Sequence, residues 1–545
     1  MASCPAADCQ YLLNPGSNVS IPALQPNPDV SGIGVLVGFV GTAYATFILL
    51  LAYYLLGLHL QDSTYDNPID AGIIKWIWRG HSPELDEKWT DAVQKAILML
   101  SDQQIVTGIA ILVAGYTQLR CGISSYHWQT IISLAWFSSF THLTTLTVLR
   151  TYLHQFQAVR ISRVILMLTV AVMLAVALMP TGSGYWFDIL SKNENELGVS
   201  VAGVPAVCFF NTLRLHNYPK AFDQGFSMLV SLFLIVFGYS VRCIQLFDKS
   251  SSLATRSLRT LPGDWWKRRV LEKALRYVPT NRVYATFGRS NMALSLYILV
   301  KAVADLLESI LWEILWLAFV LAWGTVRLIS TRQSISGSDK EVVLVESFWG
   351  FGQIVPVLLL GLPVLGLAEI GYETWLEKKH VQSQPATPVA ASPTGVNVPL
   401  MPLPVVSTSH SNANERVHDP NLSIAARYNG DFYQYEWFRA LLVLMVMFVL
   451  MIAIRYLYQL AASAPTYNYK EVLSVLGMQF MYLISMLPLL VIVSLSLQDF
   501  PLLWFRSSEP GIDYNPKQQK IYLRIWVCLV FALLLCITIW TLWFT

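Results

Sequence analysis

Several ionisable side chains of this sequence lie within long apolar stretches, where a charge is costly unless it is paired or hydrated. Asp102 stands beside Gln103 and Gln104 at the head of an apolar run that ends at Leu119. A buried carboxyl group of this kind can serve as a proton donor or as part of a polar binding site. The alternative is structural, because Ser101 and Gln104 have the spacing of a capping box that would begin a helix.

A second set of polar residues lies on the next apolar stretch. Ser138, His142 and Thr145 are spaced i, i+4 and i+7, so a helix would place them on one face. A lone histidine in such a stretch is more often a hydrogen-bonded packing residue than a ligand or a proton relay. The pattern therefore favours packing and leaves a functional role of His142 as the alternative.

The sixth apolar stretch contains the largest number of charges. Lys301, Asp305 and Glu308 share one helical face, and Lys301 and Asp305 can pair within the helix. The alternative is an amphipathic helix at the membrane interface that enters the bilayer only near Ser309. In that case Glu313 is the charge that still needs an explanation at membrane depth.

The seventh apolar stretch, FWGFGQIVPVLLLGLPVLGLAEIGYE, contains several glycines and two prolines. Proline removes a backbone donor and kinks a helix, so we expect a kinked or broken helix here. Broken helices at membrane depth commonly line substrate sites, whereas glycines also permit neighbouring helices to approach closely. Gln353 and Glu369 are the polar groups that this stretch can present.

The composition indicates which elements must hold these residues. Charged residues make up only 13% of the 545 residues and apolar ones 54%, so much of the surface must face lipid. Runs of about 20 apolar residues can cross a bilayer as helices. The sequence predicts an all-α, polytopic transmembrane helix bundle of about ten spans, near residues 32–58, 92–119, 127–153, 161–181, 223–247, 296–328, 347–371, 436–461, 471–497 and 520–544.

Basic residues in the loops predict the orientation of the chain. Residues 1–31 contain no lysine or arginine, whereas the loop 248–292 contains ten. We therefore expect an exoplasmic N-terminal tail, an uncleaved signal anchor as the first helix, and a cytoplasmic basic loop in a multi-pass protein of the plasma membrane or an endomembrane. Glycosylation is then possible at Asn18, which begins an Asn-Val-Ser sequon.

Four of the seven cysteines are expected on the oxidising side of the membrane. Cys121 and Cys208 are one candidate disulfide pair, and Cys4 and Cys9 are a second. Unpaired thiols in loops are the alternative for both pairs.

Two further segments are expected outside the membrane. Residues 372–435 include a run rich in proline and small polar residues, which predicts a disordered cytoplasmic linker between the main bundle, 32–371, and a three-helix part, 436–545. Residues 264–278 form an amphipathic pattern with a basic face, which predicts a helix that binds anionic lipids of the inner leaflet. Docking of this helix on the bundle is the alternative.

Three runs of the sequence carry a resemblance to other proteins. The runs SDQQIVTGIAILVAGYTQL and SYHWQTIISLAWFSSFTHLTTLTVLRTYL, together with FWGFGQIVPVLLL, resemble a group of uncharacterised polytopic integral membrane proteins of filamentous fungi. The resemblance covers mainly residues 89–160 and 347–371. It implies a membrane location and a fungal origin, and it implies no activity, cofactor or catalytic residue.

No Walker loop, HExxH motif or zinc-type cysteine spacing is present in the sequence, so we expect no metal, no cofactor and no nucleic-acid partner. The sequence favours a non-enzymatic membrane protein that senses or transports a small molecule or ion, with the lipid bilayer as its main partner. One alternative is an intramembrane biosynthetic enzyme for a lipid or isoprenoid, in which Asp102 acts with Glu308 or Glu313. The other is a membrane scaffold.

Overall fold

The structure is a computed structural model of the 545-residue chain. It describes residues 9, 22–58, 67–78, 87–183, 186, 201–211, 221–247, 302–338, 340–383 and 436–462. Asn18, Lys301, the segment 264–278 and the predicted spans 471–497 and 520–544 lie outside the described residues.

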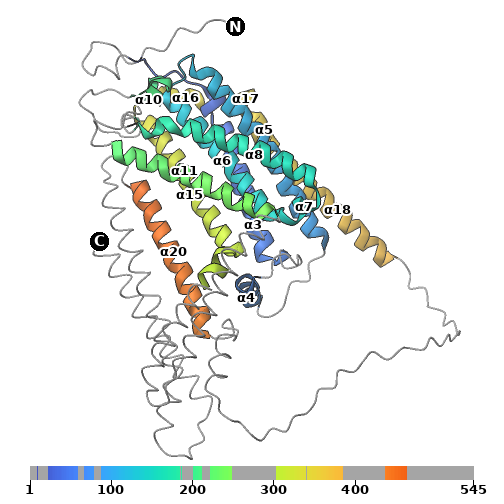
Figure 1. Ribbon diagram of the computed structural model, residues 1–545. Helices are drawn as coiled ribbons and strands as arrows, with labels where there is room; N and C mark the ends of the chain where they lie inside the picture. The colour runs from blue at the N-terminus through green and yellow to red at the C-terminus, as the bar shows by residue number, and fades with distance from the viewer. Residues whose placement is uncertain are drawn as a thin grey trace, which may run out of the picture.

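The described residues form an all-α bundle, as the sequence predicts, and no strand occurs among them (Figure 1). Seven helical segments are long and apolar enough to cross a membrane, and they coincide with the first seven predicted stretches. The helices that supply them are α3 (Ile33–Leu55, preceded by α2, Pro28–Ser31), α5 (Glu87–Leu119), α6 (Ser125–Val148), α8 (Gln157–Leu178), α11 (Ala221–Leu246), α15 (Ile310–Ser338), and α17 (Phe351–Leu359) with α18 (Leu362–Ser383).

Shorter elements connect or cap these helices. They are α4 (Pro68–Ile77), α7 (Arg150–Gln155), the 3-10 helices η2 (Met179–Gly182) and η4 (Val201–Gly203), α10 (Val207–Asn211) and α16 (Lys340–Glu346). The eighth predicted stretch is the helix α20 (Glu436–Ala462), which packs against α15 through the stacked rings of Tyr456 and Trp323.

Helix α6 is the core of the bundle. All of its residues are buried, and it contacts α3, α5, α8, α11 and α15. Most of its hydroxyl groups bond to a carbonyl four residues earlier in the same helix, as Thr141 does with Phe137 and Thr145 with Thr141. These bonds make the hydroxyls compatible with burial, because a buried polar group is costly only while it is unpaired.

The seventh stretch is broken, as its glycines and prolines predict. Helix α17 ends at Leu359, and α18 begins at Leu362 and continues to Ser383, beyond the predicted end of the span at residue 371. The glycines of this stretch predict a close approach of neighbouring helices. Glycines of α3 also allow α3 and α17 to approach each other closely. A Cβ atom on Gly38 would lie 2.4 Å from the Cβ atom of Pro356, so only glycine permits the present contact between α3 and α17.

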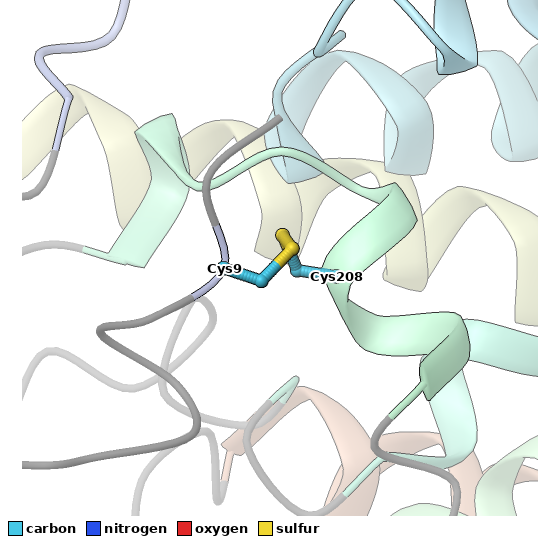
Figure 2. Close-up of a disulfide and its surroundings, with 2 residues drawn as sticks. All are labelled: Cys9 and Cys208. Atoms are coloured by element: carbon cyan, nitrogen blue, oxygen red, sulfur yellow. A yellow bond between two sulfur atoms is a disulfide. The ribbon is translucent and has the colours of Figure 1, made fainter. Parts of the chain in front are cut away.

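The disulfides differ from the predicted pairs. Cys9 bonds to Cys208, with 5.5 Å between the two Cα atoms (Figure 2). Cys121 also forms a disulfide. The predicted pairs Cys121–Cys208 and Cys4–Cys9 are therefore wrong. The physical reason is that the N-terminal segment runs across the chain before Cys208: a Cβ atom on Gly203 would lie 2.1 Å from the carbonyl oxygen of Pro22.

The Cys9–Cys208 bond closes a loop across 199 positions of sequence. Its loss should therefore increase the conformational entropy of the unfolded chain substantially. We expect Cys208→Ser to lower the free energy of unfolding by about 2–4 kcal/mol. Equilibrium unfolding in mixed micelles measures this change. Cys243→Ser is the matched control, because the thiol of Cys243 is free. Equal effects of the two variants would contradict the prediction.

Candidate functional site

Helix α5 passes without interruption through the SDQQ stretch. Ser101 and Gln104 are fully buried on its inner face, whereas Asp102 is exposed. The interpretation of Ser101 and Gln104 as a capping box is therefore wrong, because both lie well inside a helix that begins at Glu87. Gln103 is half-buried on the neighbouring face, and its carbonyl accepts a hydrogen bond from Thr107.

Helix α6 meets this inner face through the stripe that contains His142. The Ser138 hydroxyl donates to the carbonyl oxygen of Gln104 across 2.7 Å, and His142 Nε2 lies 3.3 Å from the Ser138 Oγ atom. The helices touch closely here, because a Cβ atom on Gly108 would lie 2.1 Å from Ser138 Oγ. His142 itself is fully buried.

Helix α8 adds a cation to the same region. Arg163 is nearly buried, with a side-chain exposure of 10%, and its guanidinium forms an ion pair with Asp102, whose side chain is 55% exposed. The guanidinium also lies near enough to His142 to act on it electrostatically. Asp102 therefore has a cationic partner, and the pair connects the interior of the bundle to its surface.

Four buried atoms in this region have no hydrogen-bond partner: Ser101 Oγ, Gln104 Oε1, His142 Nδ1 and Arg163 Nη1. Each unsatisfied buried atom of this kind costs on the order of 1–3 kcal/mol. We name Ser101, Gln104, Ser138, His142 and Arg163 the His142 cluster. Gln104 and His142, which the sequence placed on two separate apolar stretches, thus meet in one place, and Arg163 of α8 joins them.

The sixth stretch forms two helical segments, residues 302–307 and α15, and the described residues of the stripe belong to the first: Asp305 lies within it and Glu308 directly follows it. Asp305 is buried, Glu308 is exposed, and the chain turns at Ser309 before α15 begins. The backbone carbonyl of Asp305 accepts a hydrogen bond from the Asn67 side chain. Asp305 and Glu308 therefore both precede the break at Ser309, and Glu313 follows it in α15.

Asp70 of α4, which sequence analysis did not consider, caps the start of α15. Its carboxylate accepts hydrogen bonds from the backbone nitrogens of Ile310 and Leu311, at 2.9 and 3.2 Å, and from the Tyr54 hydroxyl. Burial raises the pKa of Asp70 above its usual value, and these hydrogen bonds partly offset that rise. Ser309 supplies a second cap, since its hydroxyl accepts a bond from the Trp312 nitrogen.

This double cap gives a stability prediction. We expect Asp70→Ala to lower the free energy of unfolding by about 1–2 kcal/mol, because two backbone donors of α15 lose their acceptor. Asp70→Asn should cost less, since it keeps one acceptor oxygen and removes a charge that burial disfavours. Thermal unfolding of the two variants beside the wild type measures the difference. A larger loss for the asparagine variant would contradict this account of the cap.

Glu313, the charge that the sequence left to be explained at membrane depth, pairs with Arg242 of α11. The two side chains are 12% and 4% exposed, and 3.9 Å separates Glu313 Oε2 from Arg242 Nη2. Arg242 Nε also donates to the carbonyl oxygen of Leu143 and to the Thr147 hydroxyl. Glu313 therefore helps to balance a buried arginine beside α6.

The most extensive polar network surrounds Glu346, at the end of the bundle where α6 begins. Its carboxylate accepts hydrogen bonds from His127 Nε2 (3.0 Å), the Tyr126 hydroxyl (3.1 Å), Arg332 (2.9 Å) and the backbone nitrogen of Asn27 (3.3 Å). Burial by itself would raise the pKa of Glu346, but the hydrogen bonds, chiefly that from His127, hold this pKa below its usual value of 4.5.

Gln353 joins α17 to the segments beside this network. Its side-chain oxygen accepts a hydrogen bond from the backbone nitrogen of Gly34, and its side-chain nitrogen donates to the carbonyl oxygen of Phe348. Gln353 thus fixes the start of α17 to the start of α3. Glu369, in α18, is exposed.

Taken together, the described residues define an all-α bundle with seven helices suited to a membrane, arranged around a buried helix with polar side chains. Within them, no three histidine, cysteine or acidic side chains are grouped so as to hold a metal ion. The class of protein that this architecture supports is an all-α bundle whose helices are long and apolar enough to span a membrane.

The chain is similar to two proteins of the fungus Elsinoe fawcettii. It is 34% identical over 115 residues to elsinochromes biosynthesis cluster protein HP3, covering 21% of this chain and 43% of that protein. It is 26% identical over 186 residues to elsinochromes biosynthesis cluster protein HP2, covering 30% of this chain and 46% of that protein. The matches thus span less than half of each relative. No family model and no solved structure matches the chain.

Proposed function

We propose that this chain is a membrane protein that transports or senses a small molecule made in a fungal biosynthetic pathway. The observation that carries the proposal is the His142 cluster, in which four buried polar atoms without partners lie beside the central helix. Buried polar groups that have no partner in the protein are expected at sites that bind a ligand or an ion. The names of the two similar proteins, both biosynthesis cluster proteins, motivate the biosynthetic context.

The charge pairs favour this proposal over catalysis. Three carboxylates that are candidates for a protonation mechanism each face an arginine: Asp102 faces Arg163, Glu313 faces Arg242, and Glu346 faces Arg332. An adjacent cation stabilises the ionised carboxylate. A proton donor for a buried substrate needs the opposite, a carboxylic acid kept neutral in an apolar pocket.

A deletion strain of the fungus that carries this chain tests the proposal. For transport, we expect the same set of pathway products as in the wild type, with their distribution between cells and medium altered by several-fold. For sensing, we expect the purified protein to be stabilised by a pathway compound. Mass spectrometry of both fractions and thermal unfolding with extracted compounds measure these effects.

Two variants make the test specific. Gln104→Leu removes one unpartnered acceptor from the His142 cluster and should reproduce the effect of the deletion. Ser133→Ala is the matched control, because the Ser133 hydroxyl bonds only to its own helix, at the Gln129 carbonyl. Loss of the final product with accumulation of its precursor would instead indicate an enzyme. An unchanged distribution together with no stabilisation would contradict both versions of the proposal.

A further inference from the structure

We propose that the His142 cluster binds one neutral hydroxyl group, supplied either by a water molecule or by a small alcohol or phenol. This inference rests on the proposed function and names the chemistry of its site. It is carried by the hydrogen-bond directions within the cluster and by the four unpartnered atoms.

The first step fixes the tautomer of His142. A carbonyl oxygen only accepts, so the single Ser138 hydroxyl proton must point at the Gln104 carbonyl oxygen, 2.7 Å away. Ser138 Oγ is then the acceptor for His142 Nε2, at 3.3 Å, and Nε2 carries the proton. In the neutral ring, Nδ1 therefore presents a lone pair, and this atom is buried without a partner.

The register of α5 and α6 places Ser101 at the level of His142. Helices α5 and α6 are consecutive and antiparallel, and the Ser138–Gln104 contact sets their register. One turn onward along α6 leads to His142, and one turn back along α5 leads to Ser101, so these two residues lie at the same level. Arg163 bonds to Asp102, the residue that follows Ser101, and acts electrostatically on His142.

The four unpartnered atoms of the His142 cluster define the ligand that the cluster can bind. The cluster offers two acceptors, His142 Nδ1 and Gln104 Oε1, and two donors, Ser101 Oγ and Arg163 Nη1. Water donates two hydrogen bonds and accepts two, so it complements all four atoms, whereas an alcohol or phenol hydroxyl accepts from the donors and gives its one proton to one of the two acceptors. A metal cation would be repelled by Arg163, and an anion without protons would leave both acceptors unpaired. The charge of Arg163 is already balanced by Asp102, which favours a neutral ligand.

Solid-state NMR of the full-length protein in lipid nanodiscs, with ¹⁵N-labelled histidine, tests the inference. The His142 signals are identified by their loss in His142→Gln. At neutral pH we expect Nε2 to be protonated and Nδ1 to be unprotonated, with the chemical shift of a nitrogen that accepts a hydrogen bond. Ser101→Ala and Gln104→Leu should each move the Nδ1 signal, whereas the control Ser133→Ala should not.

Titration with phenol and with anisole identifies the source of the hydroxyl. Phenol can donate a proton, whereas its methyl ether anisole cannot. A saturable shift of the Nδ1 signal with phenol alone, and a dissociation constant at least about tenfold weaker in Ser101→Ala, indicates a small-molecule hydroxyl. A hydrogen-bonded Nδ1 signal that neither compound changes indicates water.

Three results would overturn the inference: a protonated Nδ1, an Nδ1 signal of a nitrogen without a hydrogen bond, or equal shifts in Ser101→Ala and Ser133→Ala. Each leaves the deletion-strain result unaffected. Conversely, an unaltered metabolite distribution together with a hydrogen-bonded Nδ1 would contradict the proposed function. The inference would then stand as a site that binds water. The two failures are therefore distinguishable.

Discussion

Replacing Glu346 with alanine is expected to lower the free energy of unfolding by about 3–5 kcal/mol, because it leaves buried partners of an ion pair without their anion. The carboxylate is fully buried and holds together Asn27, His127 and Arg332, which belong to segments far apart in the sequence. Equilibrium unfolding in mixed micelles measures the loss. Because the network fixes the N-terminal segment to α6, α15 and α16, we also expect faster proteolysis near Asn27.

Glu341→Ala is the matched control, since Glu341 lies on the same helix α16 and is exposed. Its expected effect is within about 0.5 kcal/mol. If both variants lost the same stability, the hydrogen bonds to Glu346 would not be the cause.

The same network predicts an acid sensitivity. Residue 346 lies between the two neighbouring candidate spans, Ile310–Gln333 and Phe351–Glu369, and its pKa is held below the usual value of 4.5. A carboxyl group whose pKa is lower in the folded state stabilises the fold above its unfolded pKa, and this contribution disappears as the pH falls through the folded value. The stability difference between wild type and Glu346→Gln should therefore shrink as the pH is lowered from about 4.5.

Sequence analysis predicted the helices well because hydropathy is a local property. The first seven apolar stretches each correspond to a helix of sufficient length, and the proline-containing stretch is broken between Leu359 and Leu362. The sequence around Ser101 was misinterpreted at this level, and α18 continues to Ser383, past the predicted end of its span at residue 371. The spacing of a capping box also occurs inside α5, where Ser101 and Gln104 face α6 instead of ending a helix.

The sites were harder to predict because they depend on contacts between distant segments. His142 was proposed from its own stripe, but its connection to Gln104 and Arg163 required the register of α5, α6 and α8. Glu346 was missed because an acid in a short connection between two apolar stretches resembles a solvated loop residue. No local signal indicates that its partners come from three other places in the chain.

The disulfides illustrate the same limit. Four cysteines allow three connectivities, and neither the spacing nor the predicted topology selects among them. The pairing of Cys9 with Cys208 follows from the path of the N-terminal segment across Gly203, which is a tertiary feature.

Glu313→Gln is expected to be as damaging as Glu346→Ala, at about 3–5 kcal/mol of unfolding free energy, for a related reason. Its neighbour Arg242 is 4% exposed, so loss of the nearby carboxylate leaves a buried cation uncompensated. Two neutral hydrogen bonds, to Leu143 and Thr147, remain to hold the guanidinium, but they do not balance its charge. Unfolding in mixed micelles again measures the effect.

A double-mutant cycle separates the charge from the packing. Arg242→Met together with Glu313→Leu removes both charges and keeps apolar volume, so it should recover most of the stability that either single change loses. Glu369→Gln is the control, because Glu369 is exposed and its neutralisation should change little. Additive losses in the double variant would mean that Arg242 and Glu313 do not stabilise each other across the 3.9 Å between them. Packing alone would then hold Glu313 in its buried position.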